Sequence, residues 1–201
     1  MTTMPFSHVS CIILSAGTSS RMGRHKALLN YDEDSTFIQR ITNTYIQAGI
    51  EQIIVVVNAE LFDLLIDRNL NLQHNVELVV NEQPELGRFH SLQTGVQQLK
   101  PGGHCFFQNI DNPFTSECLL KQMINRKAEA DVIIPVFNKK SGHPVLISSS
   151  VMEEIIKSQD PELKINAFLK RFEIKKIDTS DHNILVNINS PEDYHKTGNR
   201  I

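Results

Sequence analysis

The sequence predicts an α/β fold of three layers, α/β/α, in which helices cover both faces of a mostly parallel β-sheet. Short β-branched apolar runs alternate with longer stretches whose apolar residues recur at helical spacing. This alternation is typical of βαβ units, whose crossovers are right-handed. Such sheets bind ligands beyond the carboxyl ends of their strands. A site is therefore expected where loops follow several strands.

The strands and helices are expected to alternate along the whole chain. The predicted strands are His8–Leu14, Gln52–Val57, Val76–Val80, His104–Gln108, Asp131–Val136, Pro144–Ile147 and Ile184–Ile188. The predicted helices cover about residues 35–49, 60–69, 88–99, 115–128, 150–158 and 190–198. No linker, repeat or low-complexity tract divides the sequence, so we expect one domain, residues 1–201.

The composition is that of a globular protein, which we expect to be cytoplasmic. The chain has 201 residues, of which 40% are hydrophobic and 21% charged, enough for one globular domain with a substantial core. A net charge of −3 gives no general attraction to nucleic acid or to an anionic membrane, so neither is an expected partner. Cys11, Cys105 and Cys118 lie in or beside apolar segments and are interpreted as reduced thiols. No signal peptide or membrane span is visible, and the oligomeric state is not indicated.

The loop after the first predicted strand indicates a phosphate-binding site. The stretch Leu14–Leu29 reads Leu-Ser-Ala-Gly-Thr-Ser-Ser-Arg-Met-Gly-Arg-His-Lys-Ala-Leu-Leu. Gly17 allows a close approach to a bulky anion, and Arg21 and Lys26 can converge on one polyphosphate, the first as a planar fork and the second as a point charge. Neither G-x-x-x-x-G-K-[ST] nor G-x-G-x-x-G fits the stretch. The alternative is a strand-to-helix loop that is glycine-rich and basic for structural reasons alone.

This loop resembles the opening motif of the nucleotidyltransferases that include the molybdenum-cofactor guanylyl- and cytidylyltransferases, and more distantly the sugar-phosphate and methylerythritol-phosphate members. The resemblance implies a Rossmann-like nucleotidyltransferase fold, the nucleotide-diphospho-sugar transferase fold. It also implies that Arg21 and Lys26 are catalytic cations on the triphosphate of an NTP. A further implication is that the end of the first strand, residues Leu14, Ser15, Ala16 and Gly17, contacts the nucleotide.

A second segment, Gly87-Arg88-Phe89-His90-Ser91-Leu92-Gln93-Thr94-Gly95, follows a proline-containing loop. Ser91 and Gly95 are four residues apart, so they share one face of the predicted helix. In the family that this segment resembles, such a helix lies against the nucleotide base, which implies that Gly87, Ser91 and Gly95 bind the nucleotide. The alternative is that the small residues only allow close packing between helix and sheet.

Two further positions are candidate ligands for Mg²⁺. Asp111 follows an apolar strand directly before Asn112-Pro113, and one carboxylate suffices when phosphates supply other oxygens. In the family that the chain resembles, the metal-binding Asp stands at this strand end, and an Asp or Asn in the motif around Asn189 supplies a second oxygen. The alternatives are an Asx turn at Asp111 and simple helix initiation by Ser190-Pro191.

Two residues are candidates for the acceptor side. The segment Gly142-His143-Pro144-Val145 resembles the Gly-His-Pro-Val segment of the branch that transfers CMP to the molybdenum cofactor, where it lines the acceptor site. His143 is therefore a candidate contact to an acceptor phosphate, with a structural role as the alternative. Lys164 is a candidate distal cation in a helix-like stretch after Asp160-Pro161-Glu162.

Together these features predict a Mg²⁺-dependent nucleotidyltransferase that transfers NMP to a phosphorylated small molecule and releases pyrophosphate. Arg21, Lys26 and Asp111 would carry the chemistry. CTP is the preferred nucleotide, because Leu14-Ser15-Ala16-Gly17 is nearer the Leu-Ala-Ala-Gly of CTP users than the Leu-Ala-Gly-Gly of GTP users. The acceptor is molybdopterin, or alternatively a sugar phosphate or small alcohol phosphate. A non-catalytic nucleotide-binding regulatory module and a phosphate-loop NTPase are the other hypotheses.

Overall fold

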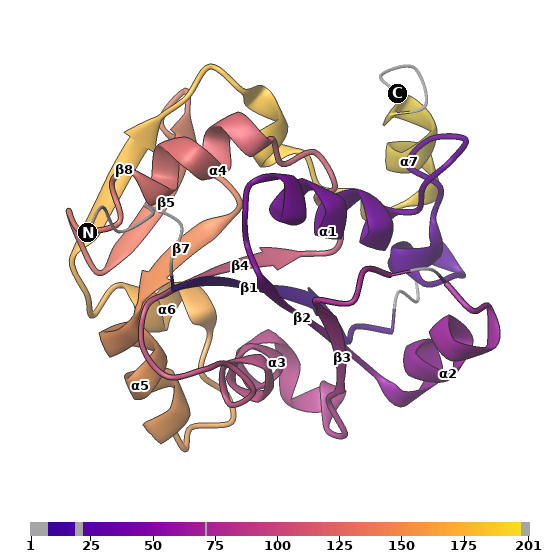
Figure 1. The fold of residues 1–201 in the computed structure, drawn as a ribbon, viewed down its shortest axis with the longest axis horizontal. Helices are drawn as coiled ribbons and strands as arrows, with labels where there is room; N and C mark the ends of the chain where they lie inside the picture. The colour runs from indigo at the N-terminus through magenta and orange to yellow at the C-terminus, as the bar shows by residue number, and fades with distance from the viewer. Residues whose placement is uncertain (1–7, 19–21, 71, 198–201) are drawn as a thin grey trace.

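The computed structural model describes residues 8–18, 22–70 and 72–197, and its strands form one eight-stranded sheet with helices on both faces (Figure 1). The parallel part of the sheet has the order β3-β2-β1-β4. Its strands are β1 (Val9–Ser15), β2 (Gln52–Val57), β3 (Val76–Val80) and β4 (His104–Asn109). Because these strands are parallel, their carboxyl ends and the loops that follow them meet at one edge of the sheet.

The rest of the sheet is mixed. It consists of β5 (Val132–Phe137), β6 (Lys140–Ser141), β7 (Val145–Ser148) and β8 (Ile174–Asp178). Strand β7 runs antiparallel between β4 and β5, β6 pairs antiparallel with β5, and β8 pairs parallel with β5. The prediction of a mostly parallel α/β sheet is confirmed, with antiparallel pairing confined to this half.

The helices form the two outer layers. Their bounds are α1 (Phe37–Gln47), α2 (Ala59–Asp67), α3 (Gly87–Val96), α4 (Glu117–Ile124), α5 (Ser149–Lys157), α6 (Ile165–Leu169) and α7 (Pro191–Thr197). Short 3₁₀ turns among the described residues include η2 (Lys26–Leu28), η3 (Pro84–Leu86) and η4 (His182–Leu185). Local capping explains several starts: the Asn58 side chain accepts a hydrogen bond from Leu61 N at 2.8 Å at the start of α2, and Thr36 and Gln39 form a capping box on α1.

Two apolar clusters hold the layers together. Helices α1 and α4 pack on one face of the sheet, and α3 and α5 pack on the other (Figure 1). On the first face, Phe37, Tyr45 and Phe106 are fully buried. On the second, Phe89 and Phe168 meet edge to face with ring centroids 5.1 Å apart. The large shared core fixes where the loops at the strand ends lie. Within the described ranges, no helix is long and apolar enough to cross a membrane.

The structure corrects the sequence prediction near the C-terminus. Residues Ile184–Ile188 do not form a strand: η4 ends at Leu185, and the Ile184 carbonyl accepts a hydrogen bond from His143 N at 3.0 Å. The strand that completes the sheet is instead β8, whose central Lys175 and Lys176 are both exposed. Strand β8 was not predicted, because its two apolar residues, Ile174 and Ile177, are three positions apart and give no alternation of apolar and polar residues.

Candidate active site

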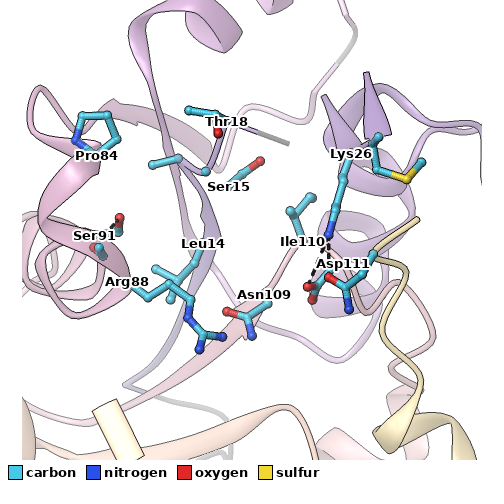
Figure 2. A pocket seen from close by; sticks show the side chains of 15 residues that line it. Leu14, Ser15, Thr18, Lys26, Pro84, Arg88, Ser91, Asn109, Ile110 and Asp111 are labelled. Carbon is cyan, nitrogen blue, oxygen red and sulfur yellow. Dashed lines mark hydrogen bonds and ion pairs between the residues drawn. The ribbon is translucent and has the colours of Figure 1, made fainter. Parts of the chain in front are cut away.

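The first cavity lies at the carboxyl edge of the parallel strands and has a volume of about 320 Å³ (Figure 2). It collects residues from the loops after β1, β3 and β4 and from the segment before α7. Its lining is Leu14, Ser15, Ala16, Gly17, Thr18, Met22, Lys26, Pro84, Gly87, Arg88, Ser91, Asn109, Ile110, Asp111 and Asn189. The convergence of loops distant in sequence is the arrangement expected of a ligand site on an open α/β sheet.

Lys26 lies between the two candidate metal ligands. It begins η2, and its Nζ donates a hydrogen bond to Asn189 Oδ1 at 2.9 Å and lies 3.6 Å from Asp111 Oδ2 (Figure 2). The Lys26 and Asp111 side chains are 12% and 20% exposed. Both charged groups therefore line the cavity while being largely shielded from solvent. An ammonium held in this way forms a fixed cationic group at one end of the cavity.

A buried polar network holds the loop that carries Asp111. The Gln108 side chain is fully buried, accepts hydrogen bonds from Tyr45 Oη and Thr115 Oγ1 at 2.8 Å, and donates to the Asn112 carbonyl. The Asp111 carbonyl accepts from Ile188 N at 2.8 Å, which ties this loop to the segment before Asn189. The Asp111 carboxylate is therefore positioned by backbone and core contacts on both sides.

The segment at Asn189 is fixed by the start of α7. The Asp193 carboxylate accepts hydrogen bonds from Asn189 N and Ser190 N, both at 3.0 Å, and Ser190 Oγ accepts from Asp193 N at 3.2 Å. These backbone amides hold the pKa of Asp193 below its ordinary value. The prediction that Ser190 and Pro191 start a helix is confirmed, and the resulting turn directs the Asn189 amide toward Lys26.

The start of α3 forms the opposite wall. Gly87 has φ +86° and ψ −168°, a conformation open essentially to glycine alone, and it joins η3 directly to α3. The Ser91 hydroxyl lines the cavity, where it accepts a hydrogen bond from Asn81 Nδ2 at 3.0 Å and donates to the Gly87 carbonyl at 3.3 Å. Ser91 is thus held in place from the end of β3.

Gly95 is absent from the lining of either cavity. A Cβ at this position would come within 2.7 Å of Ile12 Cγ2 and 3.0 Å of Val56 Cγ2. Gly95 therefore lets α3 lie close against β1 and β2, which supports the packing alternative over nucleotide contact. The two residues that share a helix face differ in position: Ser91 is at the cavity, and Gly95 is one turn farther along, over the sheet.

A second cavity, of about 630 Å³, adjoins the first and shares Gly87, Arg88 and Asn109 with it. Both acceptor candidates, His143 and Lys164, line this cavity. Its remaining residues are Glu85, Leu86, Phe89, Phe107, Val145, Pro161, Glu162, Leu163, Ile165 and Asn166. The two cavities have volumes typical of small-molecule sites.

His143 stands where the second cavity meets the end of β4. Its Nε2 lies 3.2 Å from Asn109 Nδ2, and its ring meets Phe107 edge to face at 6.4 Å. Burial lowers the pKa of His143 below the ordinary value, against the opposing effect of Asp111. The imidazole is therefore neutral at pH 7, and its Nε2 can accept a hydrogen bond from the Asn109 amide.

The geometry brings most of the predicted site residues together and adds two. Lys26, Asp111 and Asn189 meet although up to 163 residues separate them. Arg21 lies outside the described residues. Arg88 and Asn109 line both cavities but are not among the residues predicted from the sequence. Arg88 could have been predicted, because it follows Gly87 at the predicted helix start. Asn109 could not, because the sequence of a strand end does not indicate which side chain faces a cavity.

Comparisons with known proteins identify the family. The model of the MobA-like NTP transferase domain matches residues 11–175. The molybdenum cofactor cytidylyltransferase of Escherichia coli K12 is 25% identical over 190 residues, which are 94% of each chain. The "Probable molybdenum cofactor guanylyltransferase" of Bacillus cytotoxicus is 26% identical and covers 92% of this chain and 94% of the relative.

A solved structure has the same fold. The Mycobacterium tuberculosis protein Rv0371c in complex with manganese superimposes with a TM-score of 0.78 at 18% identity, over 97% of this chain and all of that one. A nucleotidyl transferase from Methanothermobacter thermautotrophicus also superimposes, with a TM-score of 0.78 at 21% identity over 96% of this chain and 97% of that one. The nucleotidyltransferase fold expected from the resemblance is therefore confirmed. The chain belongs to the MobA-like NTP transferase family and is a nucleotidyltransferase.

Proposed function

We propose that this enzyme transfers CMP from CTP, in a Mg²⁺-dependent reaction, to a phosphorylated small molecule and releases pyrophosphate. The observation that carries the proposal is the cluster of Lys26, Asp111 and Asn189 at the edge of a cavity that shares three lining residues with a second one. A cation and two oxygen ligands suit a nucleoside triphosphate with its metal ion. The adjoining cavity leaves room for an acceptor.

The residues present fit a magnesium ion. Asp111 Oδ1 is buried and has no hydrogen-bond partner among the residues that the structure describes, so it is available to a ligand. Asn189 Oδ1 offers a second oxygen, shared with Lys26. Mg²⁺ binds to one or two protein oxygens and takes its other ligands from phosphates and water. When bound, it would supply charge neutralisation at the phosphates.

The bond changes are simple. An oxygen of the acceptor phosphate forms a bond to the α-phosphorus, and the bond from that phosphorus to the oxygen bridging to the β-phosphate breaks. The electron pair of the broken bond leaves with pyrophosphate. A phosphate oxygen is already ionised at pH 7, so no strong base is required, and orientation and charge stabilisation dominate. Lys26 would stabilise the leaving group, and we assign Arg21 the same task on the basis of the sequence motif.

The two cavities suggest the substrates. The preference for CTP follows from Leu14-Ser15-Ala16-Gly17, all of which line the first cavity, and from the similarity to a cytidylyltransferase. The second cavity combines apolar walls, including Phe107 and Val145, with two basic side chains and two acidic ones. These are Arg88, Lys164, Glu85 and Glu162. This combination suits an acceptor with an apolar body and a phosphate. Molybdopterin is the first candidate, and a sugar phosphate or small alcohol phosphate is the alternative.

The test is pyrophosphate release from each of the four NTPs with Mg²⁺ and, in separate reactions, molybdopterin, methylerythritol phosphate and a sugar 1-phosphate. We expect acceptor-dependent release, fastest with CTP and molybdopterin. Asp111→Asn keeps the shape but removes the charge, and should slow turnover at least about 100-fold. Asp63→Asn is the matched control, because Asp63 is exposed and lines neither cavity. NTP binding without turnover over any acceptor would contradict the proposal and favour a regulatory module.

A further inference from the structure

Arg88 occupies the boundary between the two cavities. It is the second residue of α3 and one of three residues, with Gly87 and Asn109, that line both. Its guanidinium extends across the opening toward Asn109, on the side of the first cavity away from Lys26 and Asp111 (Figure 2). Arg88 is the one charged side chain of the described residues that borders both cavities.

The Arg88 charge is not neutralised within the protein. Among the ion pairs of the described residues, none involves Arg88. The other two residues that line both cavities are uncharged, since Gly87 has no side chain and Asn109 is an amide. Glu85 also lines the second cavity, but no ion pair joins it to Arg88 among the described residues. Lys26, in contrast, already lies 3.6 Å from the Asp111 carboxylate. An exposed guanidinium without a counter-ion is a ready site for an anionic ligand.

We propose that Arg88 is a catalytic residue that contacts both reacting phosphates, the α-phosphate of the nucleotide and the phosphate of the acceptor. The inference rests on the proposed function. The new phosphorus–oxygen bond has to form where the two proposed substrate cavities meet, and Arg88 lines both cavities. Bringing two anionic phosphates together costs electrostatic energy, and a planar guanidinium can donate one hydrogen bond to each.

This placement predicts an effect on the chemical step rather than on nucleotide binding. The repulsion that Arg88 relieves exists only when both substrates are present, and it is greatest as the bond forms. Loss of Arg88 should therefore reduce kcat with a smaller change in the affinity for the nucleotide alone. A residue that only held the start of α3 in place would change nucleotide affinity and stability together.

The experiment compares wild type, Arg88→Gln and Arg88→Lys in the pyrophosphate assay with CTP, Mg²⁺ and the acceptor that supports turnover. We expect kcat to fall about 100-fold or more for Arg88→Gln, as for loss of a transition-state donor. Arg88→Lys keeps the positive charge but lacks the planar guanidinium with its two parallel donors, so its kcat should lie between those of Arg88→Gln and wild type. The Kd of CTP, measured by calorimetry without acceptor, should change less than about threefold. Arg68→Gln removes an exposed arginine that lines neither cavity and serves as the control.

The outcomes separate this inference from the proposed function. If wild type turns over and Arg88→Gln retains its kcat, the role of Arg88 is wrong and the proposed function stands. If Arg88→Gln loses CTP affinity as strongly as kcat, Arg88 binds the nucleotide and the proposed role at both phosphates is wrong. If wild type releases no pyrophosphate with any acceptor, the proposed function fails, and the assignment of Arg88 fails with it.

Discussion

The two halves of the sheet differ in how they build the site. In the parallel half, β1 to β4 place their carboxyl ends side by side, and the loops that follow β1, β3 and β4 line the first cavity. The second cavity also uses the mixed half, through His143 and Val145 at the start of the antiparallel β7 and through the stretch 161–166 before and at the start of α6. Its other lining residues come from η3, α3 and β4. The cavity that we propose for the nucleotide thus follows from strand order, whereas the cavity that we propose for the acceptor depends in part on irregular segments.

The difference suggests why one fold can serve different acceptors. A site made at parallel strand ends is fixed by the hydrogen-bonded registers of the sheet core. A site made from a helix of five residues and its preceding loop has fewer such constraints and tolerates changes in sequence and length. Substitutions in the first cavity should therefore affect every reaction of this enzyme, and those in the second should affect the acceptor alone.

The largest effect is expected from Lys26→Ala. It removes the cation between Asp111 and Asn189, so kcat/KM for CTP should fall about 1,000-fold, or about 4 kcal/mol of transition-state stabilisation. Steady-state pyrophosphate release measures the change. Lys100→Ala is the control, because Lys100 is exposed and lines neither cavity. A variant with the full wild-type rate would show that Lys26 has no part in the reaction.

A stability effect comes next, at Gly95→Ala. The new methyl group would crowd Ile12 and Val56. The destabilisation by overpacking should exceed the stabilisation from the higher helix propensity of alanine, so the free energy of unfolding should fall by about 1–2 kcal/mol. Thermal unfolding should show a Tm lower by several degrees. Gly17→Ala is the matched control, since a Cβ there meets nothing within 4 Å and the stability should not change. An unchanged Tm for Gly95→Ala would contradict the packing role.

A smaller effect should distinguish the two cavities. His143→Gln keeps a polar group beside Asn109 but alters the wall of the second cavity, so the KM of the acceptor should rise about tenfold, the value of one hydrogen bond. The Kd of CTP should remain within about twofold of wild type. Equal losses for both substrates would mean that His143 acts through Asn109 on the first cavity and that the two halves are not independent.

The smallest expected effect is on the pH dependence of stability. Burial lowers the pKa of His143 and His104 in the folded protein below 6.5, so the unfolded chain binds more protons as the pH falls through that value. The free energy of unfolding should therefore decrease from pH 7 toward pH 5. Urea titrations at several pH values measure the slope, and His143→Gln should reduce it. An unchanged slope would show that His143 is not desolvated.

The sequence predicted the parallel half closely. Strands β2 and β3 have the predicted bounds, β1 is shifted by one residue at both ends, and β4 is one residue longer at its C-terminal end. The apolar runs of β1, β2 and β4 are buried, and each of the four runs is followed within a few residues by glycine, asparagine or aspartate, so pattern and structure agree. In the mixed half, β8 and the short β6 were missed, and Ile184–Ile188 was wrongly expected to be a strand. In this half, the conformation of the polar strand β8 and of the turn at Ile184 is set by contacts with neighbouring segments rather than by the local sequence pattern.

The sequence by itself determined the chemistry of the nucleotide side: a glycine-containing basic loop after a strand, a carboxylate at another strand end, and an amide before a helix. These are local patterns, because backbone conformation and side-chain type within a few residues specify them. Only the tertiary structure decided that Lys26 bridges Asp111 and Asn189, that Ser91 faces the cavity while Gly95 faces the sheet, and that Arg88 borders both cavities. Those relations join residues far apart in the chain, and only the packing of helices on the sheet sets their distances.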